Sequence, residues 1–175
     1  NTILIASALY LFFVTLRDFF IKQYKNLAQN IAHFGFSLLI LSILFNNLLS
    51  TEIITNLKVG ETYDDSKTKI VFESIDQENQ KNYKAIIANF SILNSNGAND
   101  NLSPELRVYN QPKITTSEAD IQTTLMKDKF IVINLVQNQD YFNVRYQVKP
   151  FMLWIWFSVI LISFGGVMGF LKKRL

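Results

Sequence analysis

QNIAHFGFSLLILSILFNN, residues 29–47, decides the fold of this 175-residue chain. It lies within an uncharged apolar block that runs from Ala28 to Leu49. As a helix this block is about 33 Å long, enough to cross a hydrocarbon core of about 30 Å. A helix of a soluble domain rarely runs this far without a charged face. We therefore predict a transmembrane helix over residues 28–49.

Two further apolar blocks predict two more membrane spans. Residues 1–16 carry no charge and would cover about 24 Å as a helix, which is short for a complete span. The chain starts directly in this block, so we expect a piece of a longer protein or a processed product. The third predicted span, residues 150–171, begins with Pro150, which suits a first helical turn. Trp154 and Trp156 follow where an interfacial aromatic belt would lie.

The charges beside these spans predict their direction. Residues 17–27 carry three basic side chains and one acidic one, and the tail 172–175 carries three basic ones. Because basic flanks stay inside, both segments are expected in the cytoplasm. Residues 50–149 hold 13 acidic and 11 basic side chains and lie between the second and third spans. We expect this segment outside the cytoplasm.

Residues 50–149 have the pattern of a β domain. Their apolar runs are rich in β-branched and aromatic residues, and the last run alternates apolar and polar side chains. Expected strands are 52–58, 69–75, 83–93, 105–109, 129–136 and 141–148, with a turn or loop at 94–100. Six or seven strands favour a small barrel or sandwich. The predicted fold class is a membrane protein with α-helical transmembrane spans, three in this fragment, and one extracytoplasmic all-β domain.

The composition excludes several kinds of chemistry in the β domain. The chain has no cysteine and the domain has no histidine, so a Ser–His or Cys–His mechanism cannot be built within it. The acidic pairs Asp64–Asp65 and Glu118/Asp120 favour turn and surface charge over a metal or acid–base role. Acidic and basic residues are interspersed, which argues against nucleic-acid binding. Met126 is not expected to be a metal ligand.

His33, the only histidine of the chain, is the remaining candidate. An ionisable residue in a membrane helix is a functional hypothesis by default. Asn30 and Ser37 lie on the same helix face, and Gly35 permits a close helix approach, so this face is expected to pack against protein. His33 is then either a ligand of iron, copper or zinc, or a polar link between helices. One histidine does not define a metal site, so any partner must come from elsewhere.

Four short motifs occur in a fixed order along the chain. They are AHFG at 32–35, PELRVY at 104–109, TSEADI at 116–121, and RYQVKP, WIW and GG within 145–166. In this order and spacing they resemble the C-terminal part of the CcmF family of cytochrome c-type biogenesis proteins. Leu106 departs from the more basic pattern of that family.

The resemblance implies a haem lyase component of a cytochrome c maturation pathway. Such a protein binds haem b in the membrane through two axial histidines from different helices. It helps to join haem vinyl groups to the CxxCH thiols of apocytochrome c. His33, in its AHFG context, corresponds to one axial ligand of the haem iron, and the second is expected from the missing upstream part. No catalytic residue is assigned here, and the fragment alone is not expected to catalyse the reaction.

The resemblance also implies a location and partners. The chain would be a multi-pass protein of the bacterial inner membrane with its β domain in the periplasm, and a mitochondrial inner membrane is less favoured. The implied partners are apocytochrome c, a haem chaperone, other maturation subunits, the lipid bilayer and a quinone. No nucleic-acid partner is expected.

Two other interpretations remain open. One is a membrane-anchored extracytoplasmic binding or assembly module with no haem of its own. The other is a transporter fragment, which would need a broken or polar midplane helix. Only the pair Gly165–Gly166 hints at such a break, and close helix packing explains the glycines better.

Overall fold

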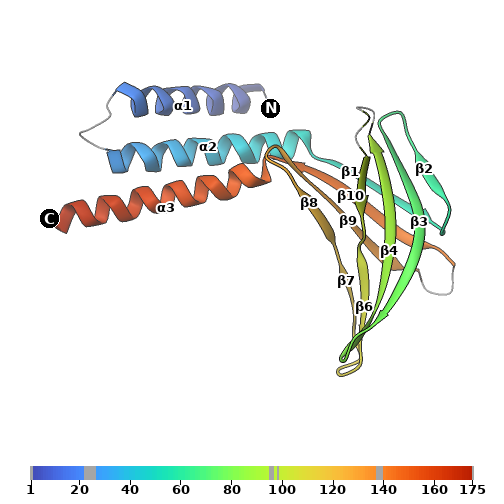
Figure 1. Cartoon of the computed structure of the whole chain (residues 1–175). Coiled ribbons are helices and arrows are strands. Elements are labelled where there is room, and N and C mark those ends of the chain that lie inside the picture. Colours follow the sequence, from blue (N-terminus) through green and yellow to red (C-terminus); the bar gives the residue numbers. More distant parts are fainter. Residues whose placement is uncertain (1, 22–26, 95–96, 98, 137–139, 175) are drawn as a thin grey trace. The chain divides into compact units, whose positions relative to one another are not determined.

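The computed structural model of the chain describes residues 2–21, 27–94, 97, 99–136 and 140–174 (Figure 1). The chain forms two compact units. One contains the three helices with Thr124–Asp128, and the other contains Thr51–Thr123 with Lys129–Val148. Two basic residues of the predicted cytoplasmic loop, Lys22 and Lys25, lie outside the described residues, as do 95, 96 and 98 of the predicted loop 94–100.

Three helices make up most of the first unit. They are α1 (Thr2–Ile21), α2 (Leu27–Leu49) and α3 (Met152–Arg174), and α2 lies between α1 and α3 (Figure 1). By length and composition each is long and apolar enough to cross a membrane. The first helix is longer than predicted. It continues past Leu16 through Arg17–Asp18, because three apolar residues follow before its end at Ile21.

The third helix begins later than predicted. Pro150 does not open α3, because the last strand, β10, extends to Pro150 and the helix starts at Met152. Phe151 lies between them with a φ of 60°, in the left-handed region. Its N–H donates a hydrogen bond to the carbonyl of Met126 (2.8 Å), while its own carbonyl accepts one from Ile155 (3.1 Å). Phe151 is therefore the junction between the strand and the helix.

The second unit is a sandwich of two sheets. Its strands are β1 (Thr51–Leu57), β2 (Thr62–Asp64), β3 (Thr68–Asn79), β4 (Tyr83–Asn94), β5 (Asn99–Leu102), β6 (Glu105–Tyr109), β7 (Thr115–Glu118), β8 (Asp120–Thr123), β9 (Lys127–Leu135) and β10 (Phe142–Pro150). One sheet has the order β1-β10-β9-β8, and the other β2-β3-β4-β6-β7, with β5 also paired to β4. The predicted class of three apolar helices with an all-β domain is confirmed, as a sandwich. The strands that the sequence missed are the short ones, β2, β5, β7 and β8.

The core of the sandwich is built from alternating residues of both sheets. Phe72 of β3 and Phe90 of β4 stack with their ring centroids 4.5 Å apart, and Phe142 of β10 meets Phe72 edge-on at 5.6 Å. Along β10, Val144 and Tyr146 are fully buried, and Phe142 packs against the same core. The predicted period of two therefore holds on the apolar face of β10.

Three polar side chains interrupt this core. The ammonium of Lys129 in β9 forms a buried ion pair with the carboxylate of Asp100 in β5, so the pair joins the two sheets. Burial, and then the charge of Asp100, raises the pKa of the Tyr146 hydroxyl to about 12. Among the described residues this hydroxyl has no hydrogen-bond partner. Lys129 lies two and four residues before the buried Ile131 and Ile133. The alternation along this strand therefore already placed the Lys129 side chain on the core face.

Candidate functional site

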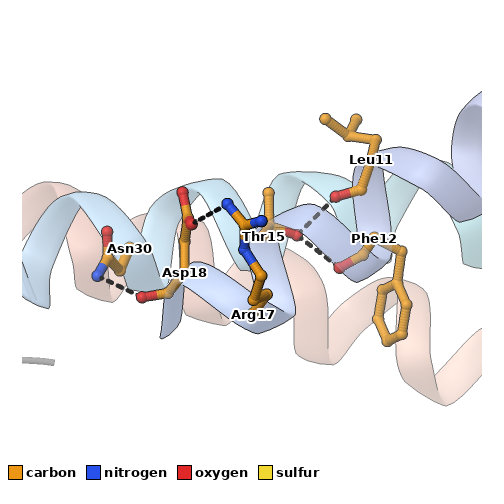
Figure 2. A network of polar contacts seen from close by, with 6 residues as sticks. All are labelled: Leu11, Phe12, Thr15, Arg17, Asp18 and Asn30. Atoms are coloured by element: carbon orange, nitrogen blue, oxygen red, sulfur yellow. Dashed lines mark hydrogen bonds and ion pairs between the residues drawn. The ribbon is translucent and has the colours of Figure 1, made fainter. Parts of the chain in front are cut away.

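Helix α2 presents three faces, and the first packs against α1. The hydroxyls of Thr15 in α1 and Ser37 in α2 lie 2.6 Å apart, and Ser37 is fully buried. The Asn30 side-chain amide donates to the backbone carbonyl of Asp18 (3.2 Å), near the end of α1 (Figure 2). Phe34 packs against Phe12 and Phe19, with ring centroids 5.6 and 6.0 Å apart. This face is therefore occupied by α1.

The polar contacts of α1 also serve the helix itself. Figure 2 shows the Thr15 hydroxyl beside the carbonyls of Leu11 and Phe12, each at 2.9 Å. The Arg17 guanidinium reaches the carboxylate of the adjacent Asp18 at 3.4 Å. Inside a membrane such backbone and side-chain contacts satisfy polar groups that have no water available. These contacts lie within α1, and none of them involves His33.

The second face of α2 packs closely against α3. A Cβ added to Gly35 would come within 2.9 Å of the Leu161 Cβ, and one added to Gly165 would meet the backbone nitrogen of Ala32 at 2.7 Å. Small residues let membrane helices approach this closely. Helix α3 is continuous through Gly165 and Gly166, so the close approach, and not a break in the helix, accounts for Gly165.

His33 lies on the third face of α2, and its side chain is exposed. Phe36, about one turn later on the same side, is 54% exposed. Each residue turns an α-helix by about 100°, so His33 lies only about 40–60° from Asn30 and Ser37. The expectation that all three pack on protein therefore holds for Asn30 and Ser37 but not for His33 within the described part of the chain. The sequence could not resolve this, because helix period alone does not locate the neighbouring helices.

His33 has no second candidate metal ligand beside it in the described part of the chain. Among the described residues, no hydrogen bond to its imidazole is found, and no three His, Cys, Asp or Glu side chains are grouped as a metal site would require. An apolar hollow of about 370 Å³ between α1 and α2 is lined by Ile40 and Ile43, about two and three turns beyond His33 on α2. The hollow is therefore not centred on the imidazole. Any further ligand of a metal or cofactor at His33 would have to come from outside the described residues.

The acidic pairs of the β unit have ordinary structural roles. The Asp65 carboxylate accepts backbone hydrogen bonds from Lys67 and Thr68, each 2.7 Å long, which lower the pKa of Asp65 and close the β2–β3 turn. The Asp120 carboxylate accepts one from the backbone of Ser103 (2.6 Å), and Glu118 accepts one from the Thr116 hydroxyl (3.1 Å). Asp65 therefore has the predicted role in a turn, whereas Glu118 and Asp120 lie in β7 and β8 and are partly buried.

The PELRVY motif, residues 104–109, occupies β6 and the residue before it. Arg107 donates to the carboxylate of Glu105 (2.8 Å), which raises the pKa of Arg107, and its guanidinium lies 5.2 Å from the centre of the Tyr83 ring. Leu106 points the other way and is buried in the sandwich core. A basic residue at position 106 would lose this apolar burial, so leucine suits the position in this chain.

Comparisons with known proteins agree with this arrangement. A family model described as "CcmF C-terminal beta-sandwich" matches residues 48–150. The chain is 27% identical over 146 residues to the cytochrome c-type biogenesis protein CcmF of Pseudomonas fluorescens, covering 83% of this chain and 22% of that protein. It is 30% identical over 117 residues to the cytochrome c-type biogenesis protein ccl1 of Rhodobacter capsulatus, covering 67% of this chain and 18% of that one. The chain thus spans about a fifth of the length of these relatives.

A solved structure has the same fold. The structure named "Cytochrome c Heme Lyase CcmF" superposes with a TM-score of 0.65 at 15% sequence identity. The likeness covers 91% of this chain and 28% of that protein.

Proposed function

Since the chain belongs to the family of the CcmF C-terminal beta-sandwich, we propose that it is the C-terminal part of an integral-membrane haem lyase subunit. In this proposal the subunit binds haem b and helps to attach haem covalently to apocytochrome c. The observation that carries the proposal is the exposed imidazole of His33 on a helix whose other two faces are filled.

The residues around His33 fit a haem in three respects. A neutral imidazole is a common axial ligand of haem iron. Phe36, about one turn after His33 on α2, is apolar and exposed, which suits contact with a porphyrin ring within a membrane. His33 makes no hydrogen bond to the described residues, so none of them engages its imidazole. Because this chain has one histidine, the second axial histidine would come from a helix of another part of the protein.

When bound, the haem iron would supply one-electron redox chemistry. The chain's own part is to present one ring nitrogen of His33 at a fixed depth and orientation. Helix α2 is fixed by α1 on one side and by α3 on the other, so the histidine is carried on a rigid support. The second ring nitrogen remains available for a hydrogen bond, which would set the tautomer and the ring orientation.

The depth of His33 supports a role in electron transfer. It lies six residues after the first residue of α2, which is about 9 Å along the helix. By the charge rule, this end of α2 is on the cytoplasmic side. A haem at this depth would be within reach of a quinone in the bilayer. Apocytochrome c, a haem chaperone and other maturation subunits would act on the opposite, periplasmic side, at the β sandwich.

The test compares two substitutions on the same face of α2 in the complete protein. His33→Ala should strongly reduce or abolish the haem b absorbance of the purified protein and stop cytochrome c maturation. Added imidazole should restore part of the absorbance, because the vacated space admits a free ligand. Gln29→Ala removes an exposed polar side chain one turn earlier and should leave the absorbance unchanged. Equal haem content in both variants would refute the role of His33.

A further inference from the structure

The turn between β8 and β9 has an unusual composition. Its tip is formed by Leu125 and Met126, which are 59% and 54% exposed. Turns of this length normally carry Gly, Asn, Asp, Pro or Ser. The turn is nevertheless well formed, because the backbone nitrogen of Thr124 donates to the carbonyl of Lys127 (3.0 Å) and that of Lys127 to the Thr124 hydroxyl (3.2 Å). Two exposed apolar side chains at an ordered tip require an explanation.

The tip is bound to the beginning of α3. The indole N–H of Trp154 donates to the carbonyl of Leu125 (3.0 Å), and the backbone N–H of Phe151 donates to the carbonyl of Met126 (2.8 Å). The second bond uses the left-handed backbone of Phe151, a conformation that persists in a bulky residue only where the surroundings hold it. Both carbonyls of the tip are therefore satisfied by protein, as they would need to be away from water.

A hollow of about 340 Å³ lies between the tip and α3. Its lining residues are all apolar: Leu125, Leu153, Trp154, Trp156, Phe157 and Ile160. Trp156 and Ile160 are each 63% exposed. On the opposite side, α3 presents the small residues Gly165 and Ser158, which are in close contact or fully buried. Small residues mark a contact with another helix, whereas bulky apolar ones mark a surface that faces lipid.

We propose that the Leu125–Met126 tip is a second membrane contact, and that the hollow beside it takes an acyl chain of a bilayer phospholipid. Helix α3 has the length and composition of a membrane span, and its first two turns carry the tryptophans that favour the membrane–water interface. The hydrogen bonds fix the tip at the same level as those turns. The hollow then opens to the hydrocarbon just below the interface. This inference depends on α3 spanning the membrane and not on haem binding by His33.

Tryptophan fluorescence can test the acyl chain directly. The two tryptophans of this chain, Trp154 and Trp156, both line the hollow, so the tryptophan emission of the 175-residue chain comes only from residues of its lining. The chain is reconstituted in phosphatidylcholine vesicles whose acyl chains carry bromine either near the glycerol end or near the methyl end. Bromine near the glycerol end should quench severalfold more strongly. Equal quenching at both depths, or none, would overturn the proposal.

A spin label at the tip tests what covers it. Met126→Cys is labelled with a nitroxide in the complete protein, with all other cysteines replaced, and Lys81→Cys in the β3–β4 turn is the control. At position 126, collisions with oxygen should exceed those with a water-soluble nickel complex severalfold, and the reverse should hold at position 81. Dominant nickel collisions at position 126 would indicate water. Exclusion of both reagents would indicate other helices of the protein, and either result would refute the lipid contact.

Discussion

Gly165 of α3 lies so close to Ala32 of α2 that a Cβ on the glycine would stand 2.7 Å from the Ala32 backbone nitrogen. Its neighbour Gly166 has nothing within 4 Å of the same position. A side chain would therefore clash at Gly165 but not at Gly166. The first sets the distance between α2 and α3, and with it the support of the helix that carries His33.

This difference predicts unequal effects of one substitution. Gly165→Leu should destabilise the helical unit by about 1–3 kcal/mol, because the clash is with backbone atoms that cannot turn aside. Gly166→Leu carries the same change in helix propensity without the clash and should be neutral or slightly stabilising. Thermal unfolding of both variants in detergent, followed by circular dichroism, measures the difference. Equal melting temperatures would contradict the close contact.

The buried ion pair between the sheets predicts a double-mutant result. Lys129→Met removes the cation from a buried carboxylate and should cost about 3–5 kcal/mol of unfolding free energy. Adding Asp100→Leu should recover most of this loss, since apolar residues of similar size often replace a buried pair at little cost. Urea unfolding of the single and double variants checks this. Additive losses would mean that the two charges do not interact.

The raised pKa of Tyr146 predicts that the folded chain loses stability at high pH. Its pKa is raised to about 12 by burial and the charge of Asp100, whereas an unfolded tyrosine titrates near 10. Between about pH 10 and 12 the unfolded state therefore holds fewer protons than the folded state, so stability falls as pH rises. The loss should approach roughly 2–3 kcal/mol.

Tyr146→Phe isolates this effect, because the other tyrosines are common to both proteins. The unfolding free energy of the original chain should fall more steeply than that of the variant between pH 9 and 12. Near pH 7 the variant should be at least as stable, since the Tyr146 hydroxyl has no partner among the described residues. Parallel pH curves would show that the hydroxyl titrates normally.

Much of the architecture could be predicted from hydropathy and periodicity. The three long apolar helices, the alternation along β10 and the resemblance to the C-terminal part of CcmF are all confirmed. These features follow from regular patterns that extend over many residues. Errors occurred at ends and in short elements. β2, for example, has only three residues, and α3 starts after Pro150 because β10 extends to that residue.

The candidate site was harder to predict than the fold. The sequence singled out His33 by its residue type, but it could not show that Asn30 and Ser37 are turned to α1 while His33 stays exposed. That outcome depends on where α1 and α3 pack around α2. The buried pair of Lys129 and Asp100 was missed because its partners lie 29 residues apart, on strands of different sheets.

The direction of the spans remains a prediction that reporter fusions can check. Residues 50–149 should lie outside the cytoplasm, because the flanking segments 17–27 and 172–175 are basic and this one is slightly acidic. A reporter that is active only outside the cytoplasm should work at Gly97 and fail after Leu175. The opposite pattern would reverse the topology and place His33 near the external side.

The haem spectrum of a His33→Gln variant of the complete protein tests the central claim most directly. Glutamine can form a hydrogen bond with a neighbouring helix but ligates haem iron poorly, so it separates a ligand from a polar link. If His33 were only such a link, the substitution would cost about 0.6 kcal/mol, at most roughly 2, and leave the chromophore intact. We expect instead that the bis-histidine haem b spectrum and cytochrome c maturation are both lost. A His33→Gln protein with a normal spectrum and full maturation would contradict the assignment.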